Sequence, residues 1–204
     1  MRVEDAKYQN HLVFNDIDCY IDFYNNLSFA VMLWVTVGTA SLLNIDTYLF
    51  SSMQGTLSSI KNILHEGRIT DAYALLRRYH DSIIINIYTN VFLAEKVSLE
   101  NFIVKQIDDW LKGTARLPEY SDMSRFIQAS VPMRKITKAL FSDERYKRIR
   151  NRCNDATHYN FYKYIIINNN KLYTENRLNF LDELQGNLQN LIILHFSLLF
   201  FIRS

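Results

Sequence analysis

The chain has 204 residues and a mass of 24.2 kDa, which suits one domain with a substantial buried core. Only 5 Gly and 2 Pro interrupt a chain that is 49% hydrophobic and has several long runs without turn signals, which favours long helices over a strand-rich sandwich. Two cysteines far apart, Cys19 and Cys153, argue against a disulfide scaffold and offer no zinc spacing. We therefore expect a cytoplasmic, all-α bundle of five to six helices.

The N-terminal half predicts three long helices. Asp16 or Asp18 is suited to cap a first helix that runs toward Leu43. A turn at 44–46 leads into a second helix that ends near His65, just before Gly67. A third helix, 70–96, has the clearest amphipathic pattern in the chain.

Two segments, 27–43 and 188–202, are so apolar that membrane-spanning helices have to be considered. Each is at or below the low end of the roughly 17–25 residues that a helix needs to cross a bilayer. We expect buried core helices and no membrane association. The N-terminus has no apolar signal-peptide region, and the end at Ser204 lacks a helix stop signal. We expect 1–204 to form one domain, and the sequence leaves open whether it is the N-terminal part of a longer chain.

The C-terminal half predicts shorter elements. A helix over 99–112 precedes a loop at 113–120, and short basic helices follow up to Leu140. From Arg125 to Arg152 there are nine Lys or Arg against two acidic residues, so this segment is the basic part of the molecule. Ser142 is suited to cap the next helix, and a small β-hairpin over 162–173 is expected before helix resumes near Thr174.

The segment 145–160, RYKRIRNRCNDATHYN, carries the candidate site. On a helix, an apolar arc faces the core and a polar stripe of Asn151, Asn154, Asp155 and His158 lies on the other side. Tyr146, Ile149, Cys153 and Ala156 form that arc. Asn and Asp each cost helix stability relative to Lys and Glu, so a solvated face alone does not account for the stripe.

An arginine beside a histidine suits RNA cleavage. Histidine transfers protons near neutral pH, arginine stabilises phosphate charge, and RNA supplies its own 2′-hydroxyl nucleophile. Arg152 and His158 lie about 9 Å apart along a helix and about 120° apart around it, so they do not touch within one chain. A two-fold dimer would bring two Arg/His sets together. Asn154 and Asp155 are placed to hydrogen-bond the imidazole, with Asn151 as a further supporting residue.

The residues Arg152 to His158 resemble the R-x(4–6)-H motif of the HEPN superfamily, small all-helical domains that are frequently metal-independent, dimeric endoribonucleases of microbial defence and toxin systems. The resemblance implies that Arg152 and His158 are the catalytic pair. Members usually have a polar residue directly after the arginine, whereas Cys153 stands there and Asn154 follows it. Arg150 is followed by Asn151 but lies eight positions from His158, so the choice between the two arginines stays open.

This interpretation predicts that the protein binds RNA, forms a homodimer and is controlled by a regulatory or antitoxin protein. It predicts no metal or other cofactor. Candidate RNA-binding residues are Lys147, Arg148, Arg150 and Tyr159. Two alternatives remain: RNA binding without cleavage, and a non-enzymatic helical module that docks a partner. A second polar cluster, Arg77, Arg78, His80 and Asp81, is a solvated flank unless its helix lies beside the site, where Asp81 or Arg77 could orient Arg152 or His158.

Overall fold

The structure, a computed structural model, describes residues 1–35, 45–98 and 103–203, and these form helices without a sheet. This confirms the all-α class, with more helices in the described ranges than the five to six expected. Their bounds are α1 Ala6–Gln9, α2 Leu12–Val35, α3 Ile45–His65, α4 Ile69–Lys96, α5 Lys105–Leu111, α6 Tyr120–Ala129, α7 Arg134–Leu140, α8 Arg145–Thr157, α9 Tyr162–Ile167 and α10 Arg177–Arg203.

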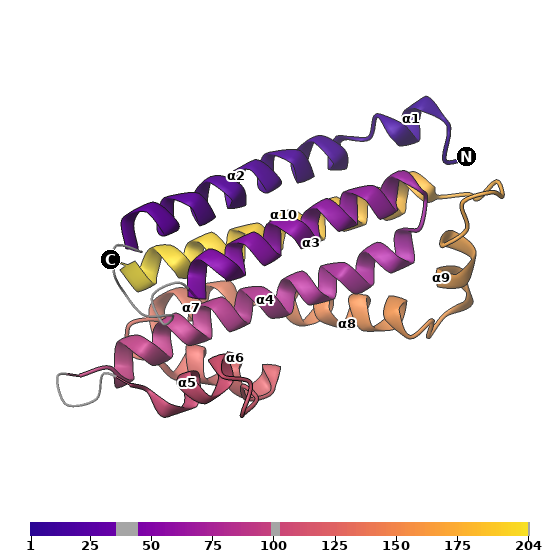
Figure 1. The fold of residues 1–204 in the computed structure, drawn as a ribbon. Helices are drawn as coiled ribbons and strands as arrows, with labels where there is room; N and C mark the ends of the chain where they lie inside the picture. Colours follow the sequence, from indigo (N-terminus) through magenta and orange to yellow (C-terminus); the bar gives the residue numbers. More distant parts are fainter. Residues whose placement is uncertain (36–44, 99–102, 204) are drawn as a thin grey trace.

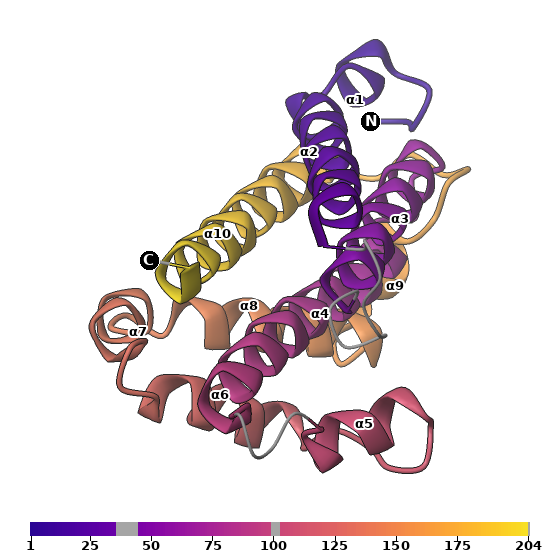
Figure 2. The ribbon, with the colours of Figure 1, turned by 60° about the vertical axis from the view of Figure 1, so that its left-hand side comes forward.

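Helix α4 is the centre of the bundle. It contacts α3, α6, α8, α9 and α10, while α2 packs mainly on α3 (Figure 1). Figure 2 shows α10 and α8 on one side of α4, with α5 and α6 below. Because α4 is covered on several sides, buried residues occur around most of its circumference, including polar His80 and Asn86. This arrangement packs α8 along α4, with α10 as its further neighbour.

The predicted second and third helices are confirmed by α3 and α4, whose ends lie within a residue or so of those expected. Helix α2 begins at Leu12, earlier than an Asp16 or Asp18 cap allows. Instead, Nδ1 of His11 accepts a 3.2 Å hydrogen bond from the backbone N–H of Val13. The expected continuation over 36–43 lies outside the described residues.

The predicted β-hairpin over 162–173 is wrong, because residues 162–167 form helix α9. The run YKYIII fits a helix as well as a strand, since Tyr164 and Ile167 are three positions apart and both are buried. The hydroxyl of Thr70 in α4 also donates a 2.6 Å hydrogen bond to the carbonyl of Tyr164. Packing on α4 therefore decides the conformation of this segment.

A chain of buried polar groups connects α2, α3, α4 and α10. The Tyr24 hydroxyl lies 2.7 Å from that of Tyr79 and 2.6 Å from Nδ1 of His195, and Nε2 of His195 lies 2.9 Å from Oδ1 of Asn86. Asn86 donates its amide to Asp46, so its Oδ1 must accept from His195, and Nδ1 of His195 then accepts from Tyr24. These bonds fix how four helices face one another.

Helix α10 is long and apolar enough, by length and composition, to cross a membrane, and one third of its most apolar window is buried in the bundle. Its buried positions include Leu184, Leu188 and Leu191, which face other helices. Ile193 and Phe200 of α10 are exposed, as are Phe29 and Leu33 of α2, so the expectation that both apolar segments are buried core helices holds only in part.

Candidate functional site

The N-terminus of helix α8 is capped by a different residue from the one that the sequence predicted. Ser142 does not cap it, because its hydroxyl donates to the carbonyl of Ala139. The carboxylate of Asp143 accepts the backbone N–H of Arg145 at 3.1 Å, and the residue before α8, Glu144, has a positive φ of 55°. A carboxylate at this end suits the helix dipole. Asp143 also binds the Arg145 side chain, which lowers the pKa of Asp143 to about 2.

The apolar arc predicted for α8 is confirmed. Tyr146, Ile149, Cys153 and Ala156 are all buried, and α8 packs along α4. Burial raises the pKa of the Cys153 thiol to about 12, so this thiol stays protonated at neutral pH. Of the polar stripe, Asn151 and His158 are exposed to solvent, and Asn154 and Asp155 are half-buried.

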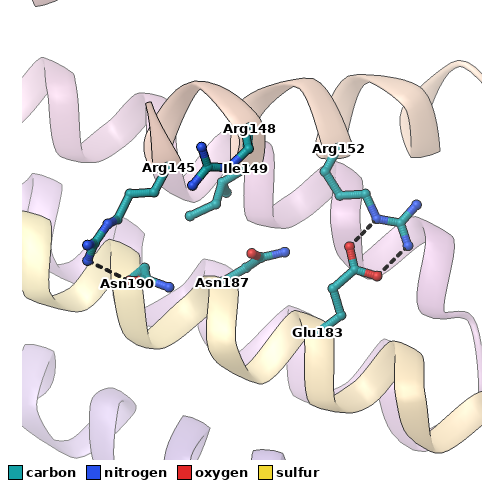
Figure 3. A pocket seen from close by; sticks show the side chains of 7 residues that line it. All are labelled: Arg145, Arg148, Ile149, Arg152, Glu183, Asn187 and Asn190. Carbon is teal, nitrogen blue, oxygen red and sulfur yellow. Dashed lines mark hydrogen bonds and ion pairs between the residues drawn. The ribbon is translucent and has the colours of Figure 1, made fainter. Parts of the chain in front are cut away.

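The side chain of Arg152 contacts α10 and the aromatic rings of Tyr73, Tyr164 and Phe180. Its Nε and Nη2 donate to the two carboxylate oxygens of Glu183, the Nη2 bond being 2.7 Å (Figure 3). Its guanidinium carbon lies 4.5 Å from the ring centre of Tyr164 and 4.9 Å from that of Tyr73. Burial has the largest single effect on Arg152 and opposes its charged form, but the hydrogen bonding and the electrostatic interactions with Glu183 and Tyr73 together outweigh it, so the pKa of Arg152 is raised overall.

Arg150 points the other way, toward α4 and α6. It forms an ion pair with Asp81, and its guanidinium carbon lies 3.4 Å from the centre of the Tyr120 ring. The proposed link between Asp81 and Arg152 or His158 is therefore wrong, because Asp81 pairs with Arg150 and Arg77. The expectation that this cluster is a solvated flank also fails for His80, which is fully buried. Burial, then Arg150 and Arg77, lower the pKa of His80 to about 3.

His158 ends α8 and is exposed. The chain turns after it in a Schellman arrangement, in which the N–H of Asn160 bonds the carbonyl of Asp155 and the N–H of Tyr159 bonds that of Ala156. Asp155 does not bind the imidazole as expected, because its carboxylate accepts the side chain of Asn160 at 2.8 Å. Among the described residues, the side chains of Asn151, Asn154 and His158 have no hydrogen-bonding partner.

A pocket of about 220 Å³ opens between α8 and α10, beside Arg152 (Figure 3). Arg145, Arg148 and Arg152 line it from α8, at a spacing that places all three on one helix face. Asn187 and Asn190 line it from α10, and Asn190 accepts a 3.3 Å hydrogen bond from Arg145. Glu183 is the only carboxylate among its lining residues. Three guanidinium groups and two amides make this a donor-rich pocket for an anion.

The other candidate residues lie outside this pocket. Lys147 is exposed and pairs with Glu144 at 3.1 Å, and Asn151 is exposed. Tyr159 is 43% exposed, and its hydroxyl accepts a 3.2 Å hydrogen bond from Asn168. The structure thus brings Arg148 and Arg152 together but leaves Arg150 and His158 apart from them. In the described ranges, no three His, Cys, Asp or Glu side chains gather where they could hold a metal ion.

Sequence reasoning missed the α10 side of the pocket. Glu183, Asn187 and Asn190 follow an i, i+4, i+7 spacing on a helix that is otherwise rich in Leu and Phe. This polar stripe on an apolar helix was the signal available in the sequence. No pattern identifies Tyr73 or Phe180 as neighbours of Arg152, since both come from distant parts of the chain.

No family model, curated protein or solved structure matches the chain.

Proposed function

We propose that this protein binds RNA through the pocket between α8 and α10 and cleaves it as a metal-independent, HEPN-type endoribonuclease, in a cytoplasmic defence or toxin setting. The observation that carries the proposal is the convergence of Arg145, Arg148 and Arg152 on one donor-rich pocket. One guanidinium group can donate hydrogen bonds to two phosphate oxygens at once, and RNA presents such oxygens at every nucleotide. Six further basic residues between 125 and 152 add to this positive charge.

In this proposal, Arg152 binds the scissile phosphate and His158 moves a proton. A base takes the proton of the 2′-hydroxyl, the 2′-oxygen attacks phosphorus, and the 5′-oxygen leaves with a proton from an acid, which gives a 2′,3′-cyclic phosphate and a 5′-hydroxyl. In the free protein the carboxylate of Glu183 accepts hydrogen bonds from two nitrogens of Arg152. Glu183 thus orients Arg152 until a phosphate oxygen replaces one of the carboxylate oxygens.

In this proposal, a second copy of the chain supplies the catalytic group that one chain lacks. Arg152 and His158 are separated along α8, and His158 is exposed at the end of the helix, where a second molecule can approach it. Paired across a two-fold axis, His158 acts as base and the partner's His158 as acid. This division supplies both proton transfers with one histidine per chain.

The test is single-turnover cleavage of a labelled RNA in EDTA, comparing the wild type with His158→Ala and Arg152→Ala. His11→Ala is the control, because His11 pairs with Asp182 outside the pocket. We expect cleavage that resists the chelator, leaves 2′,3′-cyclic phosphate ends and falls at least about 100-fold in both site variants. Intact RNA after incubation with the folded wild type, or equal cleavage by all variants, would reject the proposal.

A second candidate is a non-enzymatic module that docks a protein partner. Large apolar side chains are exposed near the ends of α2 and α10, chiefly Phe29, Leu33 and Phe200. Solution mass measurement separates the candidates: a stable homodimer favours the composite active site, whereas a monomer that cleaves nothing favours the docking module.

A further inference from the structure

The segment 158–173, here called the α9 arm, has an unusual surface. Figure 1 shows α9 at one end of the bundle, between the end of α8 and the start of α10. Most of its large apolar side chains are exposed to solvent, namely Tyr159, Phe161, Tyr162, Ile165, Ile166, Leu172 and Tyr173. So many exposed large apolar side chains within one short segment indicate a binding surface.

Tyr159 stands where backbone geometry favours glycine. It occupies the residue after the α8 cap with a φ of +51°, a left-handed conformation that is unfavourable for a bulky side chain. Glycine at this position would form the same Schellman hydrogen bonds without that strain. Tyrosine therefore carries a conformational cost that a role of its side chain would offset. Its ring is partly exposed and its hydroxyl is held by Asn168.

The charge of the α9 arm favours a polyanion. From Ala156 to Thr174 the sequence has no Asp or Glu, and it contains Lys163 and Lys171. The ammonium of Lys163 lies 5.6 Å from the ring centre of Phe161. The neighbouring carboxylate of Asp71 is paired with Arg68 and accepts the amide of Asn168. Aromatic rings interleaved with cations are the arrangement that binds single-stranded nucleic acid.

We infer that the α9 arm binds unpaired nucleobases, with Tyr159 and Tyr162 as stacking surfaces, so that the substrate is single-stranded RNA. This inference rests on the proposed function, in which the pocket on α8 takes a phosphate of the same strand. Bases in a duplex are already stacked on each other and cannot reach side chains on a protein surface. The strand follows α8 from the arginines to His158 and then meets the α9 arm.

The test measures binding of a cleavage-resistant 2′-O-methyl RNA of about 12 nucleotides, against the same strand with abasic positions and against its duplex. Tyr162→Ala is compared with Tyr48→Ala, since the two tyrosines are 72% and 73% exposed and Tyr48 lies on α3. We expect the wild type and Tyr48→Ala to bind the intact single strand about five- to 100-fold tighter than the abasic strand, and Tyr162→Ala to lose most of that preference. Tyr162→Phe should keep it.

The outcomes separate this inference from the proposed function. Equal affinity of the wild type for intact and abasic strands overturns stacking on the α9 arm but leaves phosphate binding in place. Tighter binding of the duplex overturns the inference as well. If Tyr162→Ala dissociates a dimer while the base preference persists, the surface is occupied by a second copy of the chain instead of RNA. Failure of the wild type to bind any strand rejects the proposed function itself.

Discussion

The buried polar chain of Tyr24, Tyr79, His195 and Asn86 differs sharply from the polar stripe on α8. Each group in the buried chain has a partner on another helix, at 2.6 to 2.9 Å. On the stripe, Asn151, Asn154 and His158 have no such partner among the described residues. Buried polar groups must be satisfied internally, whereas exposed ones can be satisfied by water or by a ligand. The first set therefore specifies packing, and the second is available for binding.

The largest expected effect is a loss of stability at low pH that comes from histidines in the buried interior and not from the exposed stripe. Burial lowers the pKa of His195 and of His80 to about 3, whereas an unfolded histidine titrates near 6.5. Below pH 6.5 the unfolded chain therefore binds protons that the folded chain does not, and stability falls as pH falls toward 3. At pH 5 each histidine costs about 2 kcal/mol relative to pH 7.

Urea unfolding between pH 7 and pH 5 measures this effect, and His80→Gln should remove about half of the histidine contribution. Glutamine can still reach the Tyr120 hydroxyl that bonds Nε2 of His80. The same pH dependence in the variant and the wild type would contradict the assignment of His80 as a buried neutral group.

Asn86→Ala tests the buried chain directly and should destabilise the fold by about 3 kcal/mol or more. The substitution leaves Nε2 of His195 without its acceptor and removes one donor from Asp46, and unsatisfied buried groups cost about 1–3 kcal/mol each. Asn151→Ala, on the exposed stripe, is the matched control and should be neutral or slightly stabilising. Similar losses in both variants, measured by chemical denaturation, would remove the distinction between the two regions.

Arg148→Ala should weaken RNA binding by about 1.5 kcal/mol and reduce the slope of log affinity against log salt by about one. Arg148 lines the pocket and is exposed, so little stability should be lost. Arg125→Ala, an exposed arginine on α6 outside the pocket, controls for the loss of one positive charge. Equal effects of both substitutions would show that binding follows overall charge and not this pocket.

The smallest effect is expected at the turn after α8. Tyr159→Gly should leave stability unchanged or raise it by up to about 1 kcal/mol, because glycine adopts the left-handed conformation without strain. The same variant should bind single-stranded RNA less tightly than the wild type. A clear loss of stability, seen in thermal unfolding, would mean that Tyr159 serves packing and not recognition.

Local patterns predicted much of the fold. Helices α3 and α4 follow from apolar periodicity, and the buried arc of α8 was identified residue by residue. The error at 162–167 arose because YKYIII satisfies both periodicities, and the contact between Thr70 and Tyr164 that selects the helix joins residues 94 positions apart. Long-range pairs such as this one are decided by tertiary packing.

The candidate site was predictable only on the side of α8. The spacing of Arg145, Arg148 and Arg152 is local information, whereas their meeting with Glu183 and Asn187 depends on how α10 crosses α8. The same limit explains why the sequence did not indicate that Asp81 pairs with Arg150. Arg150 and Arg152 are two positions apart and lie on different sides of the buried arc of α8, and the sequence does not state which of them lies beside Asp81.

Arg177 at the start of α10 ties the α9 arm to the rest of the bundle. This fully buried side chain donates to the carbonyls of Met1, Gly67, Asn169 and Leu172 and to the hydroxyl of Thr174. Opening the loop at 169–174 would expose the cation and break several of these bonds at once. Amide hydrogens of the loop and of the turn at Gly67 should therefore exchange with solvent deuterium as one cooperative unit.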